Sequence, residues 1–386
     1  MQSLAKIEKY TNKLKQKKER ETMAFLNSKE TRPNEEQEDS YALLAMLQCC
    51  SQIYCAVLKA SLELDLFDII AKEGGRHVSA SEVASKLPSS SQHKDLAFRI
   101  DRLLRLLASH SLLNCSVCEK EDGDTERLYS ISPVGKYFVS HGDDDSGYLT
   151  LSFICHKALM DAWMNFKVAI VEEDNDLFKK VHGMPMYRYA EIDPTWNNIF
   201  NKAMANRCNI EMRRILEIYK GFEGISTLVD VGGGTGQNLK MIVSKYPSIK
   251  AINFDLPNVI QNAPLHPRIK HVEGDMFENV PKGDAIMLKA VCHNWSDENS
   301  IKVLRKCYES LPEKGKVIVM EFIMPEEIGP TKEAKFVASL DNIMFLHDGE
   351  ERTEKEFESL CKHSGFSGFK IACRAFSALG VMEFYK

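Results

Sequence analysis

The chain has 386 residues, which is about two to three times the length of a usual domain, so we expect two domains with cores of their own and exclude a short disulfide-stapled scaffold. A hydrophobic share of 44% with 21 Gly and 13 Pro excludes collagen-like and wholly disordered chains. The formal charge of −5 gives no general attraction to phosphate backbones or anionic membranes, so we expect neither nucleic acid nor a membrane as a partner.

The 11 cysteines are scattered and odd in number. Many lie in apolar stretches, which is typical of reduced, buried thiols in an intracellular compartment: Cys49, Cys50, Cys55, Cys155, Cys208, Cys292 and Cys361. The CxxC pair Cys115 and Cys118 has no second Cys or His pair at zinc-finger spacing, so we expect no metal. No apolar stretch reaches the roughly 18–20 residues of a membrane span, and no signal-peptide core is present, which predicts a soluble, cytoplasmic protein.

Charged and amide residues dominate positions 1–38, and Pro33 ends any helix begun before it. We predict a charged, mobile tail there. Apolar residues recur at helical spacing over 41–71, which predicts two helices with a break near 64–66. Ser79, with Glu82 three residues later, has the pattern of a capping box at the start of another helix.

An amphipathic helix over 95–113, a short strand near 127–132, a turn and a further helix come next. Helices followed by a two-strand wing are the order of a winged-helix module. No basic cluster follows the helix that would contact DNA, so we favour a role in protein contacts. Helical stretches over 149–171 and 196–221 lead into the second domain.

The second domain alternates strands and helices, which predicts an α/β fold with a mostly parallel sheet covered on both faces. Ligands of such sheets lie over the carboxyl ends of the strands. We expect strands at 227–231, 251–256, 271–275, 285–291, 316–322, 369–376 and 380–385, and helices at 237–246, 300–311 and 354–365.

The first of these strands runs into a glycine-rich turn, residues 232–236, that opens a helix. Glycines allow close approach of a ligand, and the helix N-terminus offers free N–H groups, so a nucleotide-like ligand is expected. The dinucleotide fingerprint GxGxxG needs a third small residue at Gln237 or Leu239, and neither is Gly or Ala. NAD is therefore disfavoured.

Acidic residues stand at the ends of the next two predicted strands. Asp255 comes 19 residues after Gly236, where a carboxylate can accept hydrogen bonds from both hydroxyls of a ribose. Asp275 follows 20 residues later, where it can accept from an adenine amino group, with Met276 beside the ring. Ligand groups at three successive strand ends favour binding over the alternative that each Asp is a loop or cap residue.

Several motifs in order resemble plant S-adenosylmethionine-dependent small-molecule methyltransferases of the caffeic acid O-methyltransferase type. They are LVDVGGGTG, NFDLP, GDMF, LKAVCHNWSDE, KVIVMEF, GEERTEKEF and MEFYK, and the likeness covers about residues 41–386. The resemblance implies a Rossmann-like domain that binds S-adenosylmethionine, an N-terminal helical winged-helix dimerisation domain and a homodimer. It implies domains at 39–145 (dimerisation), 146–204 (helical linker contributing to the substrate pocket) and 205–386 (catalytic).

By the same resemblance, residues at the strand ends contact the methyl donor: Gly232, Asp255, Leu256, Asp275, Met276 and Lys289. His293 corresponds to the general base, and Glu321 and Glu351 flank it. The stretch 345–351 is about two residues shorter than in caffeic acid enzymes, which leaves Glu350 as an alternative to Glu351.

Positions of the acceptor pocket follow from the resemblance as well. Met184 and Met344 stand where methionines sandwich an aromatic ring, with Ile343, Trp163 and Phe153 as walls. A methionine at helical spacing is as often core filler. Asn294 stands where many relatives carry Asp beside the reacting hydroxyl, and an amide in place of a carboxylate changes which substituents are tolerated.

The expected activity is O-methylation of a phenolic specialised metabolite such as a hydroxycinnamate, flavonoid, coumarin or phenolic alkaloid. N-methylation of an aromatic amine such as an anthranilate is the closest alternative, and His293 favours oxygen. A non-catalytic dimer subunit and a winged-helix DNA regulator are further alternatives. The glycine turn together with Asp255, Asp275 and His293 argues against the first, and the lack of a basic helix argues against the second.

Overall fold

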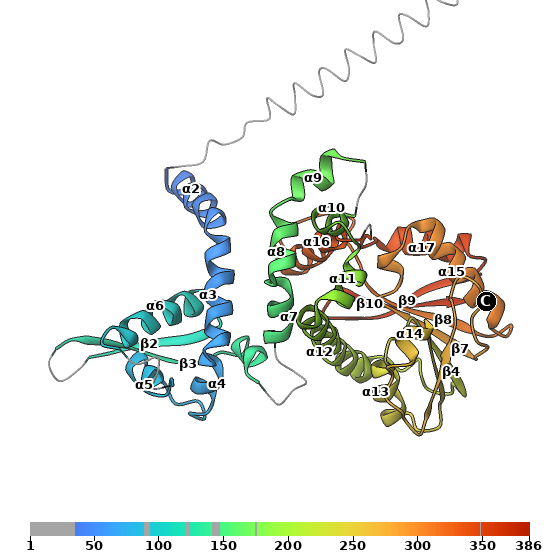
Figure 1. Cartoon of the computed structure of the whole chain (residues 1–386), viewed down its shortest axis with the longest axis horizontal. Helices are drawn as coiled ribbons and strands as arrows, with labels where there is room; N and C mark the ends of the chain where they lie inside the picture. Colours follow the sequence, from blue (N-terminus) through green and yellow to red (C-terminus); the bar gives the residue numbers. More distant parts are fainter. Residues whose placement is uncertain (1–34, 89–92, 120–122, 141–146, 174–175, 348) are drawn as a thin grey trace, which may run out of the picture. The chain divides into compact units, whose positions relative to one another are not determined.

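The computed structural model describes residues 35–386 except 89–92, 120–122, 141–146, 174–175 and 348 (Figure 1). The tail predicted for residues 1–38 thus lies outside the described residues up to position 34. By its internal contacts the chain divides into Met1–Leu58 and Lys59–Lys386, which are treated separately below.

Two helices account for the described part of the first unit. Helix α2 (Glu35–Cys49) begins inside the predicted tail, and α3 (Ser51–Glu63) continues into the second unit. The sequence did not predict the break at Cys50, whereas the break near 64–66 is present, with Asp65 at a φ of 53° before α4 (Leu66–Ala71).

Helix α2 buries none of its residues. Large apolar side chains are more than half exposed on it and on the start of α3: Tyr41, Leu43, Leu44, Met46, Leu47 and Ile53. No single helix of the described residues is long and apolar enough to cross a membrane, although α2 and α3 together, bent by 51°, meet the length and composition for a broken span.

All 11 cysteines are free thiols. The prediction that those in apolar stretches are buried is wrong for Cys49, Cys50 and Cys55, which are exposed because they lie on α2, at the break and on the uncovered start of α3. Cys155 and Cys208 are half-buried, and Cys292 and Cys361 are buried.

A small helical module with a three-stranded sheet follows. It contains α5 (Ala80–Ser85), α6 (Leu96–Ser109) and an antiparallel sheet in the order β1-β3-β2, formed by Val78–Ser79, Thr125–Ile131 and Leu113–Glu119. The predicted capping box is confirmed, since the Ser79 hydroxyl accepts from Glu82 N and the Glu82 carboxylate accepts from Ser79 N. The helix expected after the wing is a short 3₁₀ turn, η2 (Gly135–Phe138).

Short helices fill the segment before the catalytic sheet. They are α7 (Gly147–Ile154), α8 (Lys157–Trp163), α9 (Phe166–Val171), α10 (Leu177–His182) and α11 (Met186–Ile192), and the long α12 (Pro194–Ile218) follows. The sequence predicted one helical stretch over 149–171, where the structure has three helices. The predicted domain boundary between residues 204 and 205 falls inside α12, and the domain limits stay a proposal.

The predicted mostly parallel sheet is confirmed as seven strands in the order β6-β5-β4-β7-β8-β10-β9. The strands are β4 (Thr227–Val231), β5 (Lys250–Asp255), β6 (Ile269–Glu273), β7 (Ala285–Lys289), β8 (Lys316–Phe322), β9 (Gly368–Ala375) and β10 (Leu379–Tyr385). All neighbours from β6 to β8 are parallel, and β10 pairs antiparallel with both β8 and β9.

Helices cover both faces of this sheet (Figure 1). Alternate strand residues point to opposite faces, so Leu228 and Met287 pack with α12, α13 (Gln237–Lys245) and α16 (Lys332–Met344). Val229 and Leu288 pack with α15 (Asp297–Ser310) and α17 (Glu354–His363) on the other face. The carboxyl ends of the parallel strands therefore meet at one edge, where the predicted donor residues follow β4, β5, β6 and β7.

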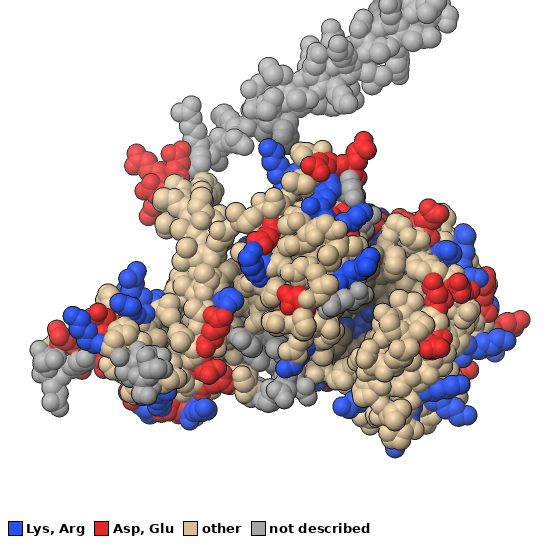
Figure 2. Space-filling model, in the orientation of Figure 1, with Lys and Arg blue, Asp and Glu red and all other residues tan. Residues whose placement is uncertain are grey.

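Charged side chains of both signs are interspersed on the face of the molecule in Figure 2. Among the described residues, exposed ion pairs one helical turn apart recur, such as Lys157 with Asp161 at 2.6 Å and Arg214 with Glu217 at 2.7 Å. Pairs of this kind contribute at most about 1 kcal/mol each to stability, so their main effect is on solvation of the surface.

Candidate active site

The glycine-rich turn joins β4 to α13 by a close backbone path. Gly232 has a φ of 68°, in the left-handed region that favours glycine. A Cβ on Gly233 would lie 2.2 Å from Asn253 Oδ1 and 2.8 Å from the Asp230 carboxylate, so a side chain there would collide with β4 and β5. The turn therefore brings backbone to within contact of buried polar groups of the sheet.

Backbone amides fix the two acidic residues predicted to bind the donor. Asp255 Oδ2 accepts from Gly234 N at 2.8 Å, and its Oδ1 accepts from Leu256 N at 2.7 Å. Asp275 Oδ1 accepts from Phe277 N at 2.8 Å. A carboxylate has about four acceptor sites, so each Asp keeps acceptor capacity for a ligand. The Leu256 side chain is 48% exposed beside them.

Buried polar atoms near the turn lack a partner among the described residues. They are Asp230 Oδ2, Asn238 Oδ1 and Asn253 Oδ1. Burial, together with the charge of Asp255, raises the pKa of Asp230 to about 7 against the opposing effect of Lys289. Acceptors orphaned in this way cost about 1–3 kcal/mol each unless a donor satisfies them. The residues present thus fit a ligand with amino and hydroxyl groups, such as S-adenosylmethionine.

Lys289 ends β7 with its ammonium buried in a charge cluster. Its Nζ donates to Glu211 Oε2, and Cys208 Sγ lies 3.7 Å away. Glu211 Oε1 accepts from Arg207 Nε at 2.7 Å. Burial opposes the charge of Glu211, but Lys289 and Arg207 outweigh it and lower the pKa of Glu211 to about 2. The structure therefore places the Lys289 ammonium against α12, and its predicted contact with the donor stays a proposal.

Sequence reasoning missed Arg207 and Glu211. Both lie on the side of α12 that faces the core, where charged residues are rare unless paired. Their separation of four residues was the available signal, because positions i and i+4 are neighbours on a helix surface.

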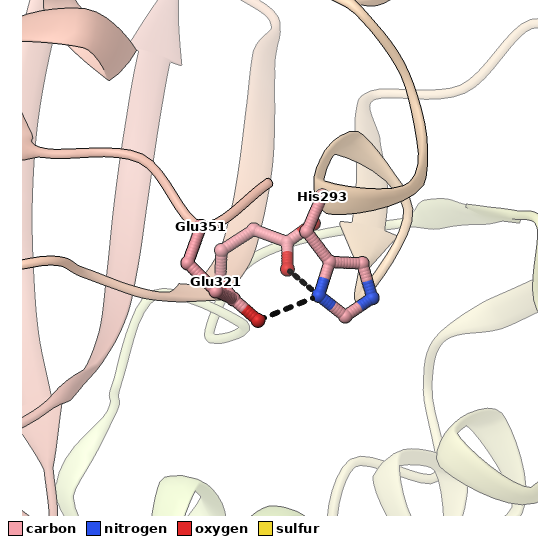
Figure 3. Close-up of side chains that lie close together, drawn as sticks. All are labelled: His293, Glu321 and Glu351. Atoms are coloured by element: carbon pink, nitrogen blue, oxygen red, sulfur yellow. Dashed lines mark hydrogen bonds and ion pairs between the residues drawn. The ribbon is translucent and has the colours of Figure 1, made fainter. Parts of the chain in front are cut away.

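His293 lies in the 3₁₀ turn η3 (Cys292–Asn294) that follows β7 and is 7% exposed. Figure 3 shows its Nδ1 turned toward two glutamates, with Nε2 on the opposite side of the ring. Nδ1 lies 2.9 Å from Glu351 Oε1 and 3.8 Å from Glu321 Oε2. An ionised carboxylate can only accept, so Nδ1 carries the proton and Nε2 is the basic nitrogen.

Electrostatics favour the protonated form of this histidine. Burial opposes its charge, but the carboxylates of Glu321 and Glu351 outweigh burial and raise the pKa of His293. Burial also raises the pKa of Glu321, against the opposing effects of His293 and two backbone amides. The cluster is therefore arranged to take up a proton at Nε2.

The two glutamates have different contacts. Glu321 Oε1 accepts from Val291 N and from Cys292 N, each at 2.8 Å, so this carboxylate shapes the turn that carries His293. Glu351 makes the direct hydrogen bond to the imidazole. Of the two alternatives that the sequence left open, Glu350 binds Arg352 Nη2 at 2.8 Å instead, and its side chain is 56% exposed.

Arg352 fastens the turn to the segment that carries Glu351, and sequence reasoning missed it. Its guanidinium donates to Cys292 O at 2.9 Å, to Trp295 O at 2.7 Å and to Asp297 Oδ1 at 2.8 Å. The side chain is 1% exposed. Arg352 follows the expected glutamate in a stretch without helical or strand periodicity. The sequence pattern therefore did not indicate that this arginine is buried.

His293, Glu321 and Glu351 form the one group in the described part of the chain with three potential metal ligands, whose atoms lie within 4.8 Å of one another. His293 Nδ1 binds Glu351 Oε1 and Glu321 Oε1 accepts from two backbone amides, whereas the buried Glu351 Oε2 has no hydrogen-bond partner among the described residues. The expectation that the protein needs no metal stays a prediction.

A strained residue precedes the His293 turn. Ala290 has a φ of 54°, and its carbonyl accepts from Asn294 Nδ2 at 3.0 Å. The left-handed conformation costs a non-glycine residue roughly 1–2 kcal/mol. The structure thus engages the Asn294 amide with the backbone of its own turn, and its predicted contact with the acceptor stays a proposal.

We expect Asn294→Ala to lower the free energy of unfolding by about 0.5–1.5 kcal/mol, because it removes the hydrogen bond that holds Ala290. In an Ala290→Gly background the same change is expected to cost less, since glycine adopts this φ without strain. Urea denaturation of the two single variants and the double variant measures the coupling. Equal costs in both backgrounds would contradict a link through Ala290.

Aromatic and aliphatic side chains from several helices form one cluster on the sheet's α12 side. Phe153 lies 5.1 Å from Trp196 between ring centroids, and Trp163 stacks on Phe166 at 5.7 Å. Ile343 of α16 packs against the same cluster. The structure thus brings together all three residues predicted as acceptor walls. Met184, in the loop between α10 and α11, and Met344, buried at the end of α16, are not among its members.

Two thiols lie beside predicted site residues, one next to the predicted donor-binding lysine and one next to the predicted catalytic histidine. Burial raises the pKa of Cys208, next to Lys289, and that of Cys292, next to His293. Both are therefore held in the neutral thiol form.

Comparison with known proteins identifies the family of the chain. Residues 163–367 match the O-methyltransferase domain family, and residues 46–141 match the O-methyltransferase dimerisation domain family. Caffeic acid 3-O-methyltransferase of Catharanthus roseus is 47% identical over 91% of this chain and 96% of the relative. O-methyltransferase 13 of Lophophora williamsii is 46% identical over 94% and 99%.

Solved structures share the fold at lower identity. Human N-acetylserotonin methyltransferase, in complex with S-adenosylmethionine, has a TM-score of 0.71 at 20% identity and covers 92% of this chain and 99% of its own. CalO1, a methyltransferase in calicheamicin biosynthesis, has a TM-score of 0.75 at 21% identity, with coverage of 90% and 98%. With these likenesses, the chain belongs to the plant O-methyltransferase family of the caffeic acid O-methyltransferase type and is an S-adenosylmethionine-dependent O-methyltransferase.

Proposed function

We propose that the protein methylates a hydroxyl of a small phenolic metabolite, with His293 as the general base. The observation that carries the proposal is the pair formed by His293 Nδ1 and Glu351 Oε1 at 2.9 Å, which leaves Nε2 on the far side of the ring (Figure 3). The relatives named caffeic acid 3-O-methyltransferase support a phenolic acceptor.

The chemistry explains why a histidine suits this task. A phenol has a pKa near 10, so its phenolate lies roughly 4 kcal/mol uphill at pH 7. An imidazole can take the proton as the new bond forms and contributes about 10²–10⁴ in rate. S-adenosylmethionine supplies a methyl group that its sulfonium already activates, so the remaining task of the protein is alignment.

The acceptor class is tested by incubation with labelled S-adenosylmethionine and a panel of phenols and aromatic amines, with products identified by mass spectrometry. We expect methyl ethers of phenols. Products restricted to N-methyl amines would favour the alternative of an N-methyltransferase. Donor binding without any methylated product would favour the alternative of a non-catalytic subunit.

We propose that the predicted donor residues bind S-adenosylmethionine: Gly232, Asp255, Leu256, Asp275, Met276 and Lys289. Asp255→Ala is expected to weaken donor binding about tenfold or more, because it removes a charge-assisted acceptor worth about 1.5–3 kcal/mol. Calorimetry on both proteins measures the dissociation constant. Asp284→Ala is a matched control, since Asp284 also accepts from a backbone amide, Thr227 N, but lies at the opposite end of the sheet. Equal affinity in Asp255→Ala and wild type would refute the role.

We propose a homodimer formed through the N-terminal domain. The match of residues 46–141 to a dimerisation domain and the exposed apolar side chains of α2 and α3 support it. Light scattering is expected to give twice the chain mass, and a stable, active monomer would contradict it. The absence of nucleic-acid and membrane partners and the cytoplasmic location stay predictions.

A further inference from the structure

One side of α12 connects the aromatic cluster with the charges at the end of β7. Trp196, Phe200 and Ala203 pack in that cluster. Arg207 and Glu211 follow on the same side, because residues three, four and seven positions apart share a helix face. Glu211 in turn binds Lys289. Arg207 therefore stands between the group proposed to hold the acceptor ring and the predicted donor site.

The Arg207 guanidinium is fixed at this place. Its Cζ lies 5.2 Å from the centroid of the Phe322 ring, and Phe322 directly follows Glu321 on β8. Its Nε donates to Glu211 Oε1 at 2.7 Å. Burial opposes the charge of Arg207, but Glu211 first and Glu351 next raise its pKa, which indicates that the predicted catalytic cluster is within electrostatic range.

The Arg207 side chain is less buried than its two charged neighbours. The Arg207 side chain is 23% exposed, whereas the side chains of Glu211 and Lys289 are 7% and 2% exposed. Of the three guanidinium nitrogens of Arg207, only Nε has a hydrogen-bond partner among the described residues. The two terminal nitrogens thus keep hydrogen-bonding capacity for a ligand.

Glu211 does not require Arg207 as its partner. Lys289 binds the other carboxylate oxygen, so Glu211 would stay paired if Arg207 were replaced. One buried carboxylate is therefore shared by two cations. The pairing with Glu211 and the packing on Phe322 do not use the two terminal nitrogens of Arg207.

We propose that Arg207 binds a carboxylate of the acceptor, so that the acceptor is an aromatic acid whose ring also carries the hydroxyl to be methylated. This inference rests on the proposed function. The guanidinium fork matches a carboxylate with two parallel hydrogen bonds, and the neighbouring aromatic cluster would hold the ring. The carboxylate of the methyl donor is the competing source of the same chemistry, and the experiment separates the two.

The test compares caffeic acid with its methyl ester, which has the same ring and hydroxyls without the charge. Arg207→Gln is expected to raise KM for caffeic acid about 10- to 100-fold, the range of a charged hydrogen bond, and to leave KM for the ester nearly unchanged. Arg207→Lys, which keeps the charge but loses the fork, is expected to be intermediate. Arg214→Gln is the matched control on the same helix, since Arg214 is 49% exposed and pairs with Glu217.

Calorimetry completes the design. Arg207→Gln is expected to bind S-adenosylmethionine with the affinity of wild type. Weaker binding of S-adenosylmethionine, with an unchanged ratio of KM for the acid to KM for the ester, would overturn the proposal in favour of the donor carboxylate. Equal losses for acid and ester would overturn it as well. Binding of caffeic acid in the presence of S-adenosylhomocysteine needs no turnover, so it tests Arg207 even if neither compound is methylated. Absence of methylation of both compounds would contradict the proposed function, not the role of Arg207.

Discussion

His293→Ala is expected to lower kcat on a phenolic acceptor by about 10²–10⁴, because the variant has no group to take the phenolic proton. Binding of S-adenosylmethionine, measured by calorimetry, is expected to stay near the wild-type value, since the proposed donor contacts come from other residues. Wild-type turnover of a phenol by this variant would rule out the proposed mechanism.

The dependence of kcat on pH is a second test of His293 as the general base. Only the neutral imidazole accepts a proton, so kcat rises with pH through the His293 pKa and levels off above it. The neighbouring carboxylates raise that pKa, so the midpoint is expected above the ordinary value of about 6.5. Glu351→Gln removes one of these charges and is expected to move the midpoint to lower pH. A midpoint that stays in place would contradict the role of Glu351.

Arg352→Met is expected to lower the free energy of unfolding by about 3–5 kcal/mol, because the Cys292 and Trp295 carbonyls lose a buried charged donor. Urea denaturation measures this loss. Arg352→Lys keeps the charge but reaches fewer partners, so we expect a folded protein with a lower kcat and a nearly unchanged KM.

Arg374→Met is the matched control for Arg352. It removes an ion pair with Glu354 at 2.8 Å from a side chain that is 35% exposed, and we expect little change in stability or kcat. If Arg352→Lys kept wild-type kcat and its pH midpoint, the arginine would have no positioning role for the His293 turn.

The strands of the catalytic sheet were predictable because each is a short apolar run bounded by turn residues. The helices between most of them predict parallel strands, whose carboxyl ends meet at one edge. Helix α16, by contrast, was not predicted. Its buried residues Val337 and Leu340 are spaced helically, but exposed Phe336 obscures the pattern. The break at Cys50 was equally unpredictable, because neither a proline nor a glycine marks it.

The candidate site was predictable where motifs stand at strand ends, as for His293 and Asp255. Sequence spacing could not show that Glu351 rather than Glu350 contacts the imidazole, because that depends on which side chain Arg352 binds. Nor could it show that Lys289 meets Glu211, since 78 residues separate them. Contacts between distant segments are set by packing, which periodicity does not encode.

The environment of Cys208 and Cys292 bears on self-methylation of the enzyme. A sulfonium methyl donor is an alkylating agent, and a cysteine thiolate is a far better nucleophile than the thiol. Because burial raises the pKa of Cys208 and Cys292, both remain protonated at neutral pH. Burial is therefore expected to lower the reactivity of both sulfur atoms toward the methyl donor.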